Sequence, residues 1–190
     1  MSGQINTMKD IIGYAAETYG GNPAIRYKVR KEIITKTYED IKKDSEAFSR
    51  ALDHMGMLGK HVAVIGPTTY EWIITYFGAA NSGCVIVPLD AQLPAADVCE
   101  LLNRADISVL VYDELRRDVA EMAVEKCPDI KCMVSMQAKE NTENVMSLQE
   151  LLKIHTGSFS CSPDPDKLCA ILFTSGTTGK SKGVMLTHRN

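Results

Sequence analysis

Short apolar runs recur at nearly even spacing through the middle of the chain. They read "HVAVIG" at 61–66, "CVIVPL" at 84–89, "ISVLVY" at 107–112 and "IKCMVS" at 130–135, and amphipathic stretches of helical period separate them. Continuous apolar strands are typical of a sheet that is buried on both faces, and helical connections between them indicate parallel strands. The pattern predicts an α/β fold, a largely parallel sheet with crossover helices.

The first third of the chain carries two helix-start signals on either side of a hairpin. Thr7 to Asp10 and Thr37 to Asp40 each match a capping box, and Gly20 with Gly21 ends the first helix. Between them "PAIRYKV" and "EIITK" flank a charged turn and predict two antiparallel strands. Later helices are expected to start at a capping box from Thr68 to Glu71 and near Pro94.

Residues 72–89 contain no charge and are long enough to span a membrane. Asn81, Ser82 and Gly83 interrupt the stretch, however, and a β-branched run and Pro88 follow. We therefore expect a helix, a turn and a buried strand, with no integral membrane segment. Trp72 and Tyr76 on that helix are expected in the core, and Asp90 is expected to cap the turn that follows the strand.

Two polar segments complete the organisation. "QAKENTENVMS" reads as an exposed loop, and "SFSCSPDPD" has the composition of a linker. Neither marks a domain boundary, and the sequence contains no internal repeat. Residues 1–190 are predicted to form one α/β unit, since a chain of this length removes roughly 70 % of its unfolded surface from water.

Charge and cysteine content narrow the function classes. With 21 basic and 24 acidic residues, the formal net charge of -3 argues against broad electrostatic binding of nucleic acid or anionic membranes. The six cysteines show no C-x-x-C pair or metal-finger spacing, so we expect reduced core thiols and no metal site. Charges near the N-terminus exclude an ordinary signal-peptide core, and a cytoplasmic location is expected.

The segment "ILFTSGTTGKSKGVMLTHRN" at 171–190 joins two apolar runs by a loop longer than a hairpin requires. Polyphosphate binding needs close main-chain N–H groups, hydroxyl donors and a mobile cation. The loop supplies glycines, hydroxyls and ammonium groups from Gly176, Gly179, Thr174, Ser175, Thr177, Thr178, Lys180 and Lys182.

The loop sequence also has to be compared with two other kinds of segment. A Walker A motif requires a glycine where Thr174 stands, and it leads into a helix, whereas "GVMLTH" is strand-like. A Gly- and Thr-rich connection is also often a solvated turn without function. His188, after the second apolar run, is expected to be a structural residue and not a general base.

The ordered run "LFTSGTTGKSKGVMLTHRN" resembles the signature of the adenylate-forming, AMP-binding superfamily of acyl-CoA synthetases, peptide-synthetase adenylation domains and luciferases. "TYEDI" at 37–41 and "GAANSGCVIVPLDAQLP" at 78–94 resemble family stretches in the same order. The resemblance implies that the chain is the N-terminal part of the family's large domain, ending in a β-hairpin with a phosphate-binding loop.

The resemblance also implies roles for the matching positions. The groups around the β- and γ-phosphates of ATP would be Thr174, Ser175, Gly176, Thr177, Thr178 and Lys182, while Gly179 would let the loop close. In such enzymes a carboxylate attacks the α-phosphate, pyrophosphate leaves with support from Mg²⁺, and the acyl group passes to a thiol, commonly that of coenzyme A. Lys182 is the candidate catalytic residue, because its charge would support the departing pyrophosphate.

One position departs from the family pattern. Ser181 stands where a proline usually precedes the final lysine, which implies a less restricted loop without nucleotide. Lys180 occupies a variable position and is expected to be a peripheral charge.

Family members are expected to be several times longer, with the adenine, acyl and metal sites further along, and Asn190 resembles an N-cap without its helix. We therefore expect a truncated piece of a fatty-acyl-type CoA ligase, inactive alone and prone to self-association. A peptide-synthetase adenylation domain and a non-catalytic phosphate-binding module remain alternatives.

Overall fold

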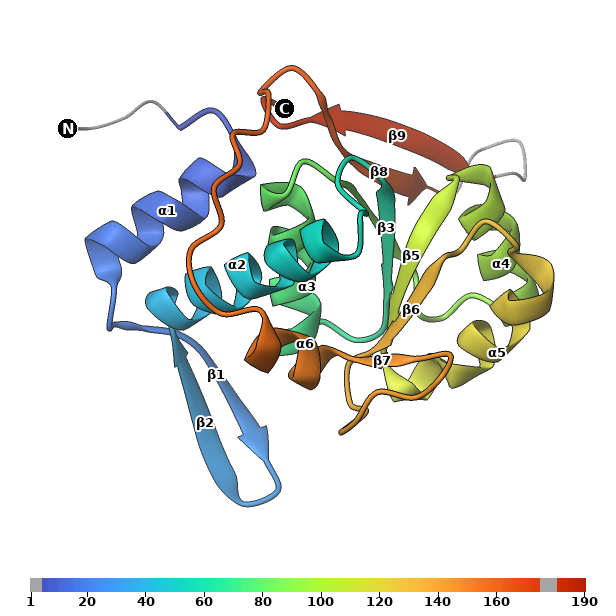
Figure 1. The fold of residues 1–190 in the computed structure, drawn as a ribbon, viewed down its shortest axis with the longest axis horizontal. Coiled ribbons are helices and arrows are strands. Elements are labelled where there is room, and N and C mark those ends of the chain that lie inside the picture. The colour runs from blue at the N-terminus through green and yellow to red at the C-terminus, as the bar shows by residue number, and fades with distance from the viewer. Residues whose placement is uncertain (1–4, 175–180) are drawn as a thin grey trace.

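A computed structural model describes residues 5–174 and 181–190 and shows a central sheet between two helical layers (Figure 1). The helices are α1 (Met8–Tyr19), α2 (Tyr38–His54), α3 (Tyr70–Asn81), α4 (Ala95–Arg104), α5 (Arg117–Lys126) and α6 (Leu148–Ile154), with a 3₁₀ turn at Glu114–Arg116. The strands are β1 (Pro23–Val29), β2 (Glu32–Thr37), β3 (His61–Ile65), β4 (Val85–Leu89), β5 (Ile107–Tyr112), β6 (Cys132–Ser135), β7 (Met146–Ser147), β8 (Leu168–Thr174) and β9 (Lys182–Thr187).

The described strands form two separate sheets. β1 and β2 pair antiparallel as a hairpin that projects from the body, and the other strands form a sheet in the order β7-β6-β5-β3-β4-β8-β9 (Figure 1). Every pair in this sheet is parallel except β8 with β9. The predicted α/β fold with a largely parallel sheet is therefore confirmed.

The sheet separates two hydrophobic cores, because side chains alternate between the faces of each strand. On one face α2, α3 and α6 cover a cluster that includes Phe48, Ile74 and Val62. On the other face α4 and α5 cover a cluster that includes Leu102 and Leu110. Burial on both faces explains why the strands read as continuous apolar runs instead of alternating ones.

Helix starts follow the predicted caps with one correction. Thr7 with Asp10 and Thr37 with Asp40 make the reciprocal hydrogen bonds of a capping box, worth about 1 kcal/mol each. The expected box from Thr68 to Glu71 is wrong, because α3 is capped by Thr69, whose hydroxyl accepts from the backbone N–H of Trp72 at 3.4 Å. The Thr69 N–H donates to the Pro67 carbonyl at 2.8 Å, and this turn moves the helix start by one residue.

The uncharged stretch 72–89 divides as predicted into α3, a turn at Ser82–Gly83 and β4. Trp72 and Tyr76 stack on each other at 5.5 Å and are half-buried against the core, so they lie at its margin. Asp90 accepts from the N–H of Gln92 at 2.8 Å, which confirms the turn cap. No helix of the described ranges is long and apolar enough to cross a bilayer.

Three further features differ from the sequence predictions. The segment expected to be only a loop ends in the short strand β7, because Met146 and Ser147 pair with β6. Helix α6 directly follows β7 and was not expected. All six thiols are free, but Cys132 and Cys161 are only half-buried, unlike the other four.

The tightest helix contact involves Gly78, where α3 crosses α2. A Cβ atom at Gly78 would lie 2.8 Å from the Ser45 carbonyl oxygen and 2.9 Å from the Phe48 ring. The buried Ser49 hydroxyl donates to the Gly78 carbonyl at 2.7 Å and to the Ser45 carbonyl at 3.0 Å. The two backbones therefore approach more closely than any larger residue permits.

We predict that Gly78→Ala lowers the free energy of unfolding by about 1–3 kcal/mol, because overpacking forces the helices apart. Gly13→Ala in α1 is the matched control, since no atom lies within 4 Å of its built Cβ, and helix propensity should raise stability by up to about 1 kcal/mol. Urea unfolding followed by circular dichroism measures both. Equal effects of the two variants would contradict the packing assignment.

Candidate phosphate-binding hairpin

The β8–β9 hairpin presents the candidate site. Register pairing places Thr174 directly opposite Lys182, at the last pair of the ladder before the connection. Six of the seven connecting residues lie outside the described residues: Ser175, Gly176, Thr177, Thr178, Gly179 and Lys180. Thus the structure describes only the two site residues that frame the loop, and both are exposed.

The hairpin reverses at the carboxyl edge of the sheet. β8 runs parallel to β4, so Thr174 lies at the same edge as the carboxyl ends of β3, β4, β5 and β6. Ligands of open α/β sheets bind outside this edge, because the strand ends and the following loops leave a crevice there. The predicted phosphate-binding loop therefore starts and ends at the edge where such a site is expected.

Thr174 and Lys182 project from the same face of the hairpin, because directly paired antiparallel residues share a face. Their Cβ atoms are expected to be about 5 Å apart. By strand alternation this is the face of Ala170, which belongs to the core under α2 and α3, whereas Ile171 belongs to the opposite core. A hydroxyl and an ammonium group are thereby brought together on one side of the sheet.

Arg104 holds the loop from the opposite face. This residue ends α4, and its guanidinium donates to the Ser181 carbonyl at 2.9 Å while lying 5.7 Å from the centre of the Phe173 ring. The contact fixes the backbone immediately before Lys182 without using the face that carries Thr174. Arg104 was not recognised from the sequence, since a single arginine at a helix end gives no signal of a contact across the sheet.

The far end of the hairpin is fastened to α1 through His188. The Met8 N–H donates to His188 Nδ1 at 3.4 Å, so the neutral ring carries its proton on Nε2. His188 is 9 % exposed, and its backbone N–H donates to the Lys167 carbonyl at 3.3 Å. Burial lowers the pKa of His188, an effect that Asp10 and Asp164 partly oppose. This geometry fits the structural role expected from the sequence.

A hydrogen-bonded cluster stiffens the same carboxyl edge next to β5. Asp113, which directly follows β5, accepts from Gln137 Nε2 at 2.6 Å and from the Leu115 N–H at 2.9 Å. Arg116 is 7 % exposed, donates to the Ala91 carbonyl at 2.8 Å, and forms a two-pronged pair with Asp118. The cluster ties together the loops that follow β4, β5 and β6, and the sequence analysis missed it.

Gly66 lets two loops of this edge come into close contact. Gly66 directly follows β3 with φ 147, and a Cβ atom there would lie 2.5 Å from the Asp113 Cβ. Only a residue without a side chain lets the loops after β3 and β5 meet this closely.

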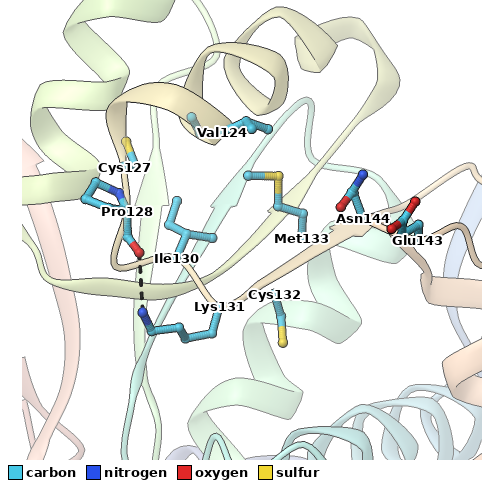
Figure 2. Close-up of a pocket in the computed structure, with 10 residues that line it drawn as sticks. Val124, Cys127, Pro128, Ile130, Lys131, Cys132, Met133, Glu143 and Asn144 are labelled. Atoms are coloured by element: carbon cyan, nitrogen blue, oxygen red, sulfur yellow. Dashed lines mark hydrogen bonds between the residues drawn. The ribbon is translucent and has the colours of Figure 1, made fainter.

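A surface pocket of about 340 Å³ lies apart from the β8–β9 hairpin (Figure 2). Its walls come from the end of α5, the residues before β6, including Cys127 and Ile130, and Glu143 with Asn144 before β7. Lys131 at its rim donates to the Pro128 carbonyl at 3.3 Å. The pocket therefore opens at the amino ends of β6 and β7, opposite to the edge that carries Thr174, and does not belong to the candidate site.

Across 5–174 and 181–190 no three histidine, cysteine or carboxylate side chains gather closely enough to hold a metal ion. Mg²⁺ takes oxygen ligands, so the Lys182 ammonium group cannot be one of them.

Comparison with known proteins decides the family. The model of the family described as "AMP-binding enzyme" matches residues 13–190. The chain belongs to the AMP-binding enzyme family. Hence the resemblance found in the loop extends through nearly the whole sequence.

Relatives and solved structures agree with this assignment. The AMP-binding chain is 26 % identical over 197 residues to the long-chain-fatty-acid–CoA ligase ACSBG2 of Rattus norvegicus, covering 97 % of this chain and 29 % of the relative. It is 29 % identical over 188 residues to the fatty acid–[acyl-carrier-protein] ligase ScoC of Streptomyces coeruleorubidus, covering 98 % of this chain and 34 % of the relative. The chain thus spans about a third of the length of these relatives.

The fold is shared with a solved structure of the anthranilate CoA ligase AuaEII in complex with anthranoyl-AMP. The TM-score is 0.87 at 18 % identity, over 96 % of this chain and 35 % of that chain. This agreement confirms the predicted architecture of an adenylate-forming enzyme's N-terminal region.

We predict that acid weakens the attachment of the hairpin to α1. Because burial lowers the pKa of His188, the unfolded chain binds the proton more tightly, and stability should fall as pH drops below about 6.5. Urea unfolding at about pH 7.5 and about pH 5.5 measures this loss, which His188→Gln should reduce. His155→Gln is the comparison: burial also lowers the pKa of His155, so this variant should reduce the loss as well, although His155 lies away from the hairpin. An unchanged pH dependence in His188→Gln would contradict the assignment.

Proposed function

We propose that this chain supplies the ATP-phosphate-binding hairpin of an ATP-dependent carboxylate:CoA ligase. The carrying observation is the placement of Thr174 opposite Lys182 at the carboxyl edge of a parallel sheet, on either side of the segment "SGTTGKS". A hydroxyl donor, a cation and a glycine-rich connection are the groups that a triphosphate requires. Family membership supports the nucleotide as the ligand.

The proposed reaction has two steps. A carboxylate oxygen of the substrate attacks the α-phosphorus of ATP, the bond from that phosphorus to the bridging oxygen breaks, and pyrophosphate leaves. A thiol then attacks the acyl carbonyl and displaces AMP. Mg²⁺ bound with the nucleotide supplies additional charge compensation.

The residues of this chain act on the departing pyrophosphate. Lys182 compensates its growing negative charge, and Thr174 donates a hydroxyl hydrogen bond to a phosphate oxygen. Ser175, Gly176, Thr177, Thr178 and Gly179 are proposed to complete the donor set from the connection between the strands. Donors aimed in advance at developing charge accelerate reactions because they need no reorganisation during the step.

We further propose a fatty acid as the carboxylate and coenzyme A as the acceptor. The named activity of the rat relative supports both choices. The name of ScoC supports an acyl-carrier protein as the alternative acceptor, since that relative covers the same part of the chain. Turnover is assigned to the longer protein, of which residues 1–190 form one domain portion, and the isolated chain is expected to form no acyl-adenylate.

We predict that Lys182→Ala in the full-length protein lowers ATP–pyrophosphate exchange by about 10²–10³-fold, by analogy with the loss of one charge-stabilising donor. Lys180→Ala is the matched control, because this position is assigned a peripheral charge and should change exchange by less than about fivefold. A panel of carboxylic acids of increasing chain length identifies the substrate in the same assay. Undiminished exchange in Lys182→Ala would refute the proposed role.

We also predict a positioning effect of Arg104. Arg104→Gln removes the charged donor that holds the Ser181 carbonyl and the cation above Phe173, so the backbone next to Lys182 should be held less firmly before ATP binds. The expected result is a KM for ATP raised about tenfold with a smaller change in kcat, and partial recovery in Arg104→Lys. A reduced kcat at unchanged KM would argue against positioning of the ground-state nucleotide.

A further inference from the structure

The β1–β2 hairpin extends away from the rest of the molecule (Figure 1). Its base is attached through Tyr27, which stacks on Tyr70 at 6.3 Å, and through Lys36, which lies 3.7 Å from the Asp44 carboxylate. Beyond this base the two strands pair with each other, from Arg26 opposite Thr35 to Val29 opposite Glu32. The outer half of the hairpin therefore offers a free surface.

The hairpin has a charge opposite to that of the whole chain. Residues 23–37 contain five basic residues and a single acidic one, whereas the chain has a formal net charge of -3. Among the described residues, Arg26, Lys28, Arg30 and Lys31 take part in no ion pair. Their positive charge is consequently available to an external partner.

The register places two of these charges beside an exposed apolar side chain on the outer face. Arg26 and Lys28 alternate with Tyr27, so they point away from the helices that Tyr27 contacts. Lys28 pairs with Ile33, which lies on the same face and is 72 % exposed. Val29 is 48 % exposed, but by the same alternation it lies on the face of Tyr27, beside the turn. The outer face therefore combines Arg26 and Lys28 with Ile33, and the tip adds Arg30, Lys31 and Val29.

The turn retains a basic residue where glycine would be easier to accommodate. Arg30 and Lys31 form the two-residue connection, and Arg30 has φ 55. This left-handed conformation favours glycine, asparagine or aspartate, because a Cβ atom crowds the backbone there. The strain at Arg30 is consistent with a function for the cation at the tip, since strained residues concentrate at functional sites.

We propose that the β1–β2 hairpin docks on an anionic lipid surface. The four cations would lie among the headgroups, where each basic residue is attracted by the negative surface potential, and Ile33 with Val29 would enter the interfacial layer. The exposed apolar pair distinguishes this partner from nucleic acid, whose phosphates provide no counterpart for an isoleucine. The rest of the chain is net acidic and is repelled by an anionic membrane. The hairpin, and not another face, should therefore approach the membrane surface. The inference does not depend on the ligase activity.

The test is co-sedimentation of the 190-residue chain with vesicles. Vesicles of equal parts phosphatidylcholine and phosphatidylserine should bind the protein, whereas vesicles of phosphatidylcholine alone should bind at least about tenfold more weakly. Added salt should weaken binding to the mixed vesicles, because screening shortens the reach of the surface potential. Equal binding to both vesicle types would overturn the proposal.

Substitutions in the β1–β2 hairpin test whether this segment carries the vesicle binding. The combined substitutions Arg26→Gln, Lys28→Gln, Arg30→Gly and Lys31→Gln should weaken binding to mixed vesicles by about tenfold or more, with circular dichroism unchanged. Ile33→Ser alone should weaken it by about threefold or more, because one apolar group is lost. The matched control replaces four exposed lysines outside the hairpin, Lys60, Lys126, Lys139 and Lys167, by glutamine and should retain binding.

Two further measurements make the outcome decisive. The conservative pair Arg26→Lys and Arg30→Lys should retain vesicle binding, since the charge is kept, so a loss in this pair would contradict the charge-based mechanism. A duplex DNA probe should bind more weakly than mixed vesicles and show no dependence on Ile33. DNA binding that equals vesicle binding and survives Ile33→Ser would assign the hairpin to nucleic acid and overturn the lipid proposal.

Discussion

The reversal of the chain between β8 and β9 is the constraint on which the site depends. β8 is held by parallel pairing to β4 inside the sheet, and β9 returns antiparallel along it. Because both strands are fixed in register, the connection begins and ends at the carboxyl edge with Thr174 facing Lys182. The sheet thereby sets where the predicted phosphate-binding loop begins and ends, which local sequence alone does not fix.

The surrounding structure stabilises that reversal from several directions. Arg104 holds the Ser181 carbonyl from the α4 side, and His188 fastens the other end of the hairpin to the start of α1. The close crossing of α2 and α3 at Gly78 supports the core on the face of Thr174. β9 itself is an edge strand with Val184 and Met185 exposed, and self-association through this edge stays a prediction.

Sequence predicted best where one local pattern determines one structure. The apolar runs identified β3 to β6, and reciprocal threonine–aspartate caps identified α1 and α2, because these signals lie within a few residues. Thr69 was missed as a cap since the turn at Pro67, and not composition, decides where α3 begins. Strand β7 was missed because two residues pair only when β6 lies beside them.

The candidate site likewise has features that a local sequence pattern reveals and features that only the fold reveals. The motif predicts the loop residues, because glycines, hydroxyls and lysines in one ordered run are visible in the sequence, and their role stays a prediction. Arg104 and the Asp113–Gln137 contact were invisible, since each joins residues that only the folded sheet brings together. Long-range partners of this kind require the topology before they are assigned.

A structure of the full-length protein with ATP bound tests the central claim most directly. The account predicts that the β- and γ-phosphates lie within hydrogen-bonding distance of the Thr174 hydroxyl and the Lys182 ammonium group, at the carboxyl edge of the sheet. Phosphates bound at another edge, with Thr174 and Lys182 both facing solvent, would contradict it.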